Sequence, residues 1–300
     1  MENNLQEPNV VCFGEVLYDV FPTHKKIGGA PLNVALRLAS LGINTQIVSR
    51  IGNDAIGNEL LSFIKKNKVK TNLIQVDPLY KTGEVIVELN DKGSASYTIN
   101  YPVAWDKIEC NPEIENTVKK ADAFIYGSLV CRDNTSFETL VELIGYAKYK
   151  VFDVNLRAPF YKKKVLINLM MQSDFIKFND DELYEISKFL NSPYHSLKQN
   201  ILYIAETTNT NRICVTLGCH GAILYYDDTF YYNSGYEIKV ADTVGAGDSF
   251  LAGLISELLT QNDPQKAIDF ACALGALVAE KEGANPIISN SKITKFMNPI

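Results

Sequence analysis

The segment from residue 123 to 218 decides the fold, because short apolar runs alternate along it with helix-length amphipathic stretches. The apolar runs are AFIYGSLV at 123–130, VFDVNL at 151–156, DFIKFN at 174–179 and RICVTLG at 212–218. Short apolar strands separated by helices predict βαβ units, in which helices cover both faces of a parallel sheet. We therefore expect a doubly wound α/β fold with a mostly parallel sheet flanked by helices.

The N-terminal part continues this alternation. The stretches VVCFGEV at 10–16 and TQIVSRIG at 45–52 flank a predicted helix at about 31–41. That helix opens with Pro31, which suits a first helical turn because its missing N–H would be unpaired there. Both strands are expected to join the same sheet.

Residues 81–105 follow a different pattern. The runs VIVELN and SASYTIN lie on either side of Asn90-Asp91-Lys92-Gly93, which predicts a β-hairpin with a short turn that contains glycine. Two hairpin strands cannot all belong to a parallel sheet, so we expect a small antiparallel flap. A flap that closes on a ligand and a plain edge hairpin fit the pattern equally well.

Composition and charge exclude several classes of protein. The chain has 300 residues, a net charge of −6 and a pI near 5.3, which argues against a nucleic-acid or anionic-membrane binder. No apolar run reaches the roughly 18–20 residues of a membrane span. The N-terminal stretch MENNLQEPN lacks the basic-then-apolar order of a signal peptide, so we expect a cytoplasmic protein.

Cysteine and histidine usage argues against disulfides and zinc. The six cysteines are scattered without a C-x-x-C pair, so free thiols are expected. The three histidines have no ligand spacing beside them. The chemistry must therefore be sought in other motifs.

The stretch TVGAGDSFLAGL at 243–254 places Gly245, Gly247 and Asp248 directly before an apolar run with helical spacing. A helix start has free N–H groups and a positive dipole end, and glycines let an anion approach the backbone closely. Asp248 could then take a proton from a nucleophile that attacks a phosphate. Alone, the pattern is equally typical of a helix with a carboxylate in its first turn. It is not a Walker A loop.

The stretch IGGAPLNVALRLASLG at 27–42 is a second glycine-led helix start. Gly28 and Gly29 permit close approach of the backbone, and Asn33 offers a donor and an acceptor one turn later. Asp19 ends a strand-like run upstream. A carboxylate and an amide beside bare backbone suit a polyol, although a tight turn would explain the same residues.

Three further stretches follow predicted strands. Asp153, Asn155 and Arg157 alternate in FDVNLRAPF, which predicts that they share one strand face. In KFNDDELYEI an asparagine and a glutamate are three residues apart, and TLGCHGAILYY carries two glycines after a strand. A helix cap and a β-turn would explain the last two patterns equally well.

In this order and spacing, the motifs resemble those of the PfkB (ribokinase-like) carbohydrate kinases over nearly the whole chain. GEVLYDVFP, GGAPLNVA, YGSLVCR and YPVAW look most like bacterial fructokinases. The resemblance implies one ribokinase-like α/β domain over 1–300, with a β lid formed by about 14–26 and 81–104. It also implies ATP as co-substrate, Mg²⁺ as cofactor and K⁺ as a candidate activator.

The resemblance also implies roles for individual residues. The catalytic base is Asp248, and the anion hole for the transferred phosphoryl group is Gly245, Ala246 and Gly247. The sugar contacts are Asp19, Gly28, Gly29, Asn33 and Arg157. The nucleotide contacts are Asn179, Thr216, Gly218 and Gly221. The metal positions are Glu182 for Mg²⁺, partly through water, and Asp242, Val244 and Gly283 for a monovalent cation.

The implied reaction is transfer of the γ-phosphoryl group of ATP to the primary hydroxyl of a hexose, with fructose as the first candidate. Many ribokinases have G-G-K-G-A-N where this chain has GGAPLN, which favours hexoses over ribose. One alternative is 2-keto-3-deoxygluconate, whose carboxylate Arg157 or Arg132 would hold. The other is a catalytically inactive sugar-binding regulator. Lid strands in this family often pair across a dimer, so a homodimer is a further expectation.

Overall fold

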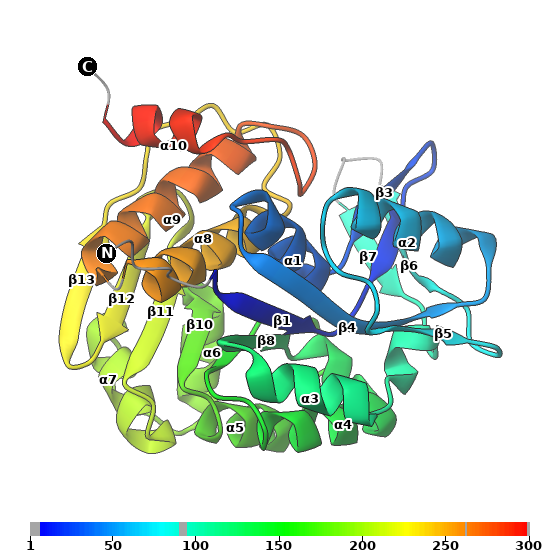
Figure 1. Cartoon of the computed structure of the whole chain (residues 1–300). Coiled ribbons are helices and arrows are strands. Elements are labelled where there is room, and N and C mark those ends of the chain that lie inside the picture. The colour runs from blue at the N-terminus through cyan, green and yellow to red at the C-terminus, as the bar shows by residue number, and fades with distance from the viewer. Residues whose placement is uncertain (1–6, 90–94, 262, 299–300) are drawn as a thin grey trace, which may run out of the picture.

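A computed structural model describes residues 7–89, 95–261 and 263–298 (Figure 1). Its main element is a nine-stranded sheet. In spatial order the strands are β13 (Thr229–Asn233), β12 (Ala222–Tyr226), β11 (Arg212–Thr216), β10 (Phe175–Asn179), β9 (Lys150–Asp153), β8 (Ala123–Gly127), β1 (Asn9–Phe13), β4 (Asn44–Gly52) and β5 (Ile74–Asp77). Neighbours from β11 to β5 pair in parallel, while β12 pairs antiparallel with β11 and the edge strand β13 pairs antiparallel with β12. The predicted mostly parallel sheet is confirmed.

Helices cover both faces of this sheet (Figure 1). One face carries α1 (Ala30–Ser40), α2 (Ala55–Lys66), α8 (Ala246–Thr260) and α9 (Pro264–Ala279), with α10 (Asn290–Met297) packed on α9. The other face carries α3 (Pro112–Lys120), α4 (Asn134–Ile144), α5 (Lys163–Met171), α6 (Asp180–Phe189) and α7 (Leu197–Thr208). Among the described residues, no helix has the length and apolarity that crossing a bilayer requires.

The central strand β1 contributes side chains to the apolar core on each face of the sheet. Val10 and Cys12 pack among the residues of α1 and α8, whereas Val11 and Phe13 pack among those of α3 and α4. Successive side chains of a strand point to opposite faces, so a continuous apolar run is what a doubly covered strand requires.

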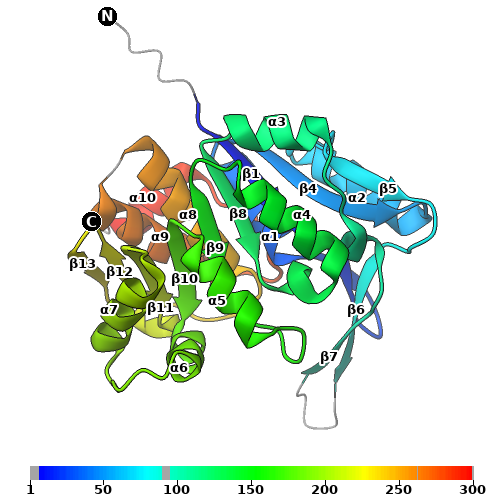
Figure 2. The same ribbon diagram turned by 90° about the horizontal axis from the view of Figure 1, so that it is seen from below.

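A second, four-stranded sheet projects from the body (Figure 2). Its strands, in spatial order, are β3 (Lys25–Gly28), β2 (Leu17–Val20), β6 (Gly83–Leu89) and β7 (Ala95–Ile99). The predicted hairpin is present as the antiparallel pair β6–β7. β2 pairs antiparallel with β3 and parallel with β6. The turn predicted at 90–93 lies outside the described residues.

Several strands end before their apolar runs do. The run at 123–130 leaves the sheet after Gly127 and forms a 3₁₀ turn over Leu129–Arg132. The run at 151–156 ends as a strand at Asp153, and Asn155 has a φ of 37°, in the left-handed region. The prediction that Asp153, Asn155 and Arg157 share one strand face is therefore wrong, because the extended conformation that alternation requires stops at the first of them.

Candidate active site

The motif residues gather at the carboxyl ends of the parallel strands, beside the starts of α1 and α8. This is the edge of an open α/β sheet at which ligands commonly bind. A cavity of about 240 Å³ opens there. It is lined by Thr216, Gly218, Cys219, Gly221, Gly235, Tyr236, Ile238, Val240, Thr243, Ala246, Gly247, Phe250, Cys272, Gly275, Ala276 and Ala279. The cavity reaches the first turn of α8.

Helix α8 begins as an uncapped helix N-terminus. Gly245 precedes it with a φ of 76°, and no side chain caps the helix. A Cβ on Gly245 would lie 2.5 Å from the Cα of Ala284, so both the backbone angle and the neighbouring backbone require glycine. The first N–H groups of the helix and its dipole therefore remain available to an anion.

Gly247 faces open space rather than protein. A Cβ added there would meet only the Nζ atom of Lys177, at 3.8 Å. Glycine at the second position of a helix costs about 1 kcal/mol relative to alanine, and here no packing requires it. The vacant volume lies in the wall of the cavity, where a phosphate could approach the backbone.

Asp248 lies in the first turn of α8 and is held by a chain of amides. Asn33 Nδ2 donates to Asp248 Oδ2 at 2.8 Å, and Asn285 Nδ2 donates to Asn33 Oδ1 at 2.8 Å. Burial and, after it, the Asp153 carboxylate raise the pKa of Asp248 to about 6, against the opposing effects of Asn33, Lys177 and Arg157. A carboxyl group with this pKa is ionised at neutral pH and close enough to it to accept a proton.

The first turn of α1 meets β2 and the loop after β1. Gly29 has a φ of 108°, and a Cβ on it would lie 2.4 Å from the carbonyl oxygen of Glu15. A Cβ on Gly28 would lie 2.5 Å from Asp19 Oδ2, so this carboxylate lies directly over the glycine. Burial raises the pKa of Asp19 to about 6, and Arg157 opposes the rise. The structure thus brings these predicted sugar contacts together.

Glu182 and Asn179 form a reciprocal cap at the start of α6. Asn179 Oδ1 accepts from the Glu182 N–H, and Glu182 Oε2 accepts from the Asn179 N–H, both at 2.8 Å. The other oxygen, Oε1, accepts from the Leu156 N–H at 2.8 Å. Burial raises the pKa of Glu182, and Lys177 opposes the rise. The helix-cap interpretation is correct, and it leaves lone pairs on both carboxylate oxygens.

Three of the four predicted nucleotide residues line the cavity, whereas the predicted cation residues lie outside its lining, in two loops. Thr216, Gly218 and Gly221 all line the cavity. Asp242 Oδ1 accepts from the Val244 N–H and Oδ2 from the Gly283 N–H, both at 3.0 Å. These two loops are therefore held together. Across the described ranges, no group of three or more His, Cys, Asp or Glu side chains is arranged to hold a metal ion.

Sequence reasoning missed four residues of this region. Glu15 is only 3% exposed, and burial raises its pKa to about 7. Lys177 and Asn285 contact the site, and Arg37 donates to Ser249 Oγ at 3.1 Å and to the Pro286 carbonyl at 3.0 Å. The available signal was a charged residue inside an apolar run, as in FIKFN and LNVALRLAS.

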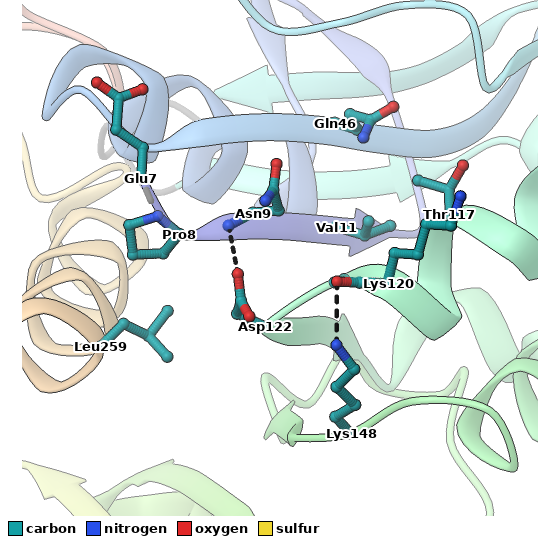
Figure 3. A pocket seen from close by; sticks show the side chains of 11 residues that line it. Glu7, Pro8, Asn9, Val11, Gln46, Thr117, Lys120, Asp122, Lys148 and Leu259 are labelled. Atoms are coloured by element: carbon teal, nitrogen blue, oxygen red, sulfur yellow. Dashed lines mark hydrogen bonds between the residues drawn. The ribbon is translucent and has the colours of Figure 1, made fainter. Parts of the chain in front are cut away.

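A larger hollow, of about 800 Å³, lies at the opposite edge of the sheet (Figure 3). Its polar groups are already paired in two places: Asp122 accepts from the Asn9 N–H at 2.8 Å, and Lys148 donates to the Lys120 carbonyl at 3.3 Å. None of the predicted site residues lines it. Size therefore does not identify the active site in this fold.

Comparisons with known proteins agree with this geometry. The model of the pfkB family of carbohydrate kinases matches residues 2–291. The chain is 29% identical to probable fructokinase-6, chloroplastic, of Arabidopsis thaliana, over 94% of this chain and 80% of that protein. It is 30% identical to PH1459 of Pyrococcus horikoshii, described as an uncharacterized sugar kinase, over 93% of this chain and 89% of that one.

Solved structures show the same architecture. The fructokinase of Vibrio cholerae, determined with fructose, ADP and calcium bound, superposes with a TM-score of 0.84 at 23% identity, covering 97% of this chain and 99% of that one. This likeness concerns the fold, whereas the family model matches the sequence itself over residues 2–291. The chain belongs to the pfkB family of carbohydrate kinases.

Proposed function

We propose that this protein is a fructokinase, which transfers the γ-phosphoryl group of ATP to the primary hydroxyl of fructose to give fructose 6-phosphate and ADP. The observation that carries the proposal is Asp248, a carboxylate one residue beyond the open glycine of a helix start. An anion site and a base side by side are what phosphoryl transfer to a hydroxyl needs. The similarity to probable fructokinase-6 of Arabidopsis thaliana supports the choice of fructose as the sugar.

In this proposal the sugar lies between the small sheet and α1. Asp19, Asn33 and Arg157 supply acceptors and donors to its hydroxyls, and Gly28 and Gly29 leave the backbone bare. The small sheet, about 14–26 and 81–104, acts as a lid on the single domain 1–300. Lys26 of β3 lies 3.6 Å from Asp242, which links this lid to the body.

ATP would place its base in the apolar 240 Å³ cavity and its γ-phosphate at the start of α8. Glu182, with Asn179, would hold Mg²⁺ partly through water, because each Glu182 oxygen accepts one N–H and keeps a further lone pair. Bound Mg²⁺ would offset the charge of the phosphates. A monovalent cation would bind between the loops of Asp242, Val244 and Gly283.

The proposed reaction is an in-line displacement at the γ-phosphorus. The sugar oxygen forms a bond to the γ-phosphorus, Asp248 accepts the hydroxyl proton, and the bond to the β–γ bridging oxygen breaks to release ADP. The N–H groups at Gly245, Ala246 and Gly247 stabilise charge on the transferring group. Positioning and charge stabilisation supply much of the catalysis, beside the proton transfer to Asp248.

The charges around the sugar position favour a neutral sugar over an acidic one. Arg132 is committed to Asp106, with which it makes two hydrogen bonds of 2.7 and 2.8 Å, and both side chains are buried. Arg157 opposes the burial-induced rise in the pKa values of Glu15, Asp19 and Asp248, so three carboxyl groups already interact with its positive charge. A carboxylated sugar such as 2-keto-3-deoxygluconate would add a fourth negative charge.

The test is ATP-dependent phosphorylation of four substrates: fructose, ribose, 2-keto-3-deoxygluconate and adenosine. The quantity measured is the rate of ADP release. We expect the largest kcat/KM with fructose, and a background rate in Asp248→Asn. A preference for 2-keto-3-deoxygluconate would show that the proposed substrate is wrong and that the protein is still a sugar kinase. Thermal stabilisation by a sugar without any ADP release would identify a sugar-binding regulator instead.

A further inference from the structure

Strand β10 carries a lysine where its neighbours are apolar. Lys177 lies among Phe175, Ile176 and Phe178, which are fully buried, and its own side chain is only 8% exposed. β10 has paired strands on both sides, so no edge lets the ammonium reach solvent sideways. Burying a charge in this way costs several kcal/mol even when it is paired, so a packing role does not explain the lysine.

The partner of this lysine lies directly opposite it on the neighbouring strand. Lys177 and Asp153 are paired residues in the β9–β10 register, and Lys177 Nζ donates to Asp153 Oδ1 at 2.8 Å. The Asp153 side chain is 6% exposed, and its second oxygen, Oδ2, is buried without a hydrogen-bond partner among the described residues. The pair therefore sits inside the protein with one carboxylate oxygen unsatisfied.

The ammonium points toward the start of α8. Lys177 Nζ is the one atom that a Cβ on Gly247 would meet, at 3.8 Å, and Asp248 is the next residue along the chain. Lys177 also interacts electrostatically with Glu182. The buried pair thus lies beneath the proposed phosphate position, with carboxyl groups on two sides of its ammonium.

Several charged or polar groups interact with Asp248, and they come from different segments around it, although α9, which packs against α8, supplies none of them. They are Glu15 from the loop after β1, Asn33 from α1, Asp153 from the end of β9, Arg157 from the loop that follows, and Lys177 from β10. Of these, Lys177 and Asp153 are the only oppositely charged pair that is hydrogen-bonded to each other among the residues described. They act on Asp248 in opposite directions.

We propose that the Lys177–Asp153 pair is a control element of the phosphoryl-transfer site: Lys177 is a positioning residue that keeps Asp248 ionised, and Asp153 limits that effect. The inference rests on the proposed role of Asp248 as the base. Lys177 offsets the negative charge of Asp153, Glu182 and Asp248 before any phosphate enters. Asp153 in turn prevents an unpaired ammonium from removing the basicity that proton transfer requires.

The proposal predicts shifts of opposite sign. Loss of Lys177 leaves Asp153 facing Asp248 without compensation, so the pKa of Asp248 rises and the acid limb of kcat/KM moves to higher pH. Loss of the Asp153 charge removes a repulsion and frees Lys177, so the limb moves to lower pH. A charge within about 4–6 Å changes a pKa by about 1–3 units, so we expect a shift of about one unit each way.

The experiment measures kcat/KM against pH for the wild type and for Lys177→Met, Lys177→Arg, Asp153→Asn and the double variant Lys177→Met/Asp153→Asn. The sugar is whichever of the four test substrates the wild type phosphorylates. Lys177→Arg keeps the positive charge, so the acid limb of kcat/KM should stay at the same pH as in the wild type. The double variant, which buries no charge at this position, should return the limb toward that of the wild type.

A second lysine–aspartate pair provides the matched control. Lys150 of β9 and Asp174, which precedes β10, lie 3.1 Å apart at the opposite end of the same two strands. Lys150→Met should leave the acid limb unchanged. If Lys177→Met does not fold, Asp153→Asn and the double variant still test the sign of the effect.

Opposite shifts in Lys177→Met and Asp153→Asn support the proposal. A limb that stays in place in both variants, or moves in the same direction in both, overturns it. The proposed base is tested separately: normal turnover in Asp248→Asn would refute the role of Asp248, whereas an inactive Asp248→Asn beside an unmoved limb would refute only the role of the pair.

Discussion

Two helix starts in this protein look alike in sequence and differ in what surrounds them. Both α1 and α8 follow a glycine with positive φ, 108° at Gly29 and 76° at Gly245, and neither start is capped by a side chain. The two helices also pack against each other, and Arg37 of α1 donates to Ser249 of α8. Their shared motif is a bare backbone before an apolar helix.

The difference is what occupies the space beside the backbone. At α1 the carbonyl of Glu15 leaves no room for a Cβ on Gly29, because the two would be 2.4 Å apart. At α8 the equivalent glycine, Gly245, is crowded in the same way, because a Cβ on it would lie 2.5 Å from the Cα of Ala284. Two residues later, however, the volume beside Gly247 is open except for Lys177 Nζ at 3.8 Å. Gly29 therefore serves the packing of the chain against itself, whereas Gly247 leaves room beside the first turn of α8.

The largest effect should come from Asp248→Asn at the open start. The amide cannot accept the sugar proton, and it removes a charge favoured by the helix dipole, so kcat should fall by roughly three orders of magnitude or more. Folding and sugar binding should remain close to normal. Steady-state kinetics with sugar-induced thermal stabilisation tests this; near-normal turnover would remove Asp248 from the mechanism.

At the filled start, Gly29→Ala should affect stability first. The positive φ and the contact with the Glu15 carbonyl both oppose a side chain, so the free energy of unfolding should fall by about 3 kcal/mol. Urea denaturation measures it. An unchanged midpoint would mean that the loop at Glu15 moves aside easily, and the contrast between the two starts would then weaken.

At the open start, Gly247→Ala should show the reverse pattern. Alanine stabilises a helix by about 1 kcal/mol relative to glycine, so the denaturation midpoint should hold or rise. The added methyl group would occupy the proposed phosphate position, and kcat/KM for ATP should fall by about 10- to 100-fold. A simultaneous loss of stability would show that Gly247 is a packing residue like Gly29.

The smallest effect should come from Glu15, whose buried carboxyl group lies in the loop after β1. Burial raises the pKa of Glu15 from 4.5 to about 7 in the folded protein, so protonation stabilises the fold at low pH and this contribution is lost as the pH rises through about 7. Glu15→Gln should therefore raise the free energy of unfolding at pH 8 by about 1 kcal/mol. The gain should shrink at pH 5. Denaturation curves at both pH values test this, and an equal gain at both would contradict the assignment.

Much of the fold could be predicted because its signals are local. Continuous apolar runs separated by amphipathic stretches identified the parallel strands, and helical spacing identified the helix that follows Gly245. Two β-rich runs around a glycine-containing turn identified the hairpin β6–β7. The limits of the strands could not be predicted, because Leu129–Arg132 and residues after Asp153 are apolar enough to extend a strand, yet leave the sheet.

The site was predictable where its residues stand beside glycines and less so elsewhere. Asp248 and Asn33 each belong to a recognisable motif, but the hydrogen bond between them joins positions 215 residues apart. Asn285 and Lys177 carry no local signal beyond polarity in an apolar context. Their importance comes from partners that only the folded chain brings near, namely Asn33 and Asp153.

The Arg37 guanidinium has a consequence for how the protein is made. It joins α1 to Ser249 and to the carbonyl of Pro286, groups that leave the ribosome more than 200 residues after it. Until then α1 exists with its arginine and its apolar face, but α8, the helix that covers them, has not yet been made. Nascent chains that stop before α8 should therefore expose this apolar face, which makes them prone to aggregate until the C-terminal part of the chain has been made.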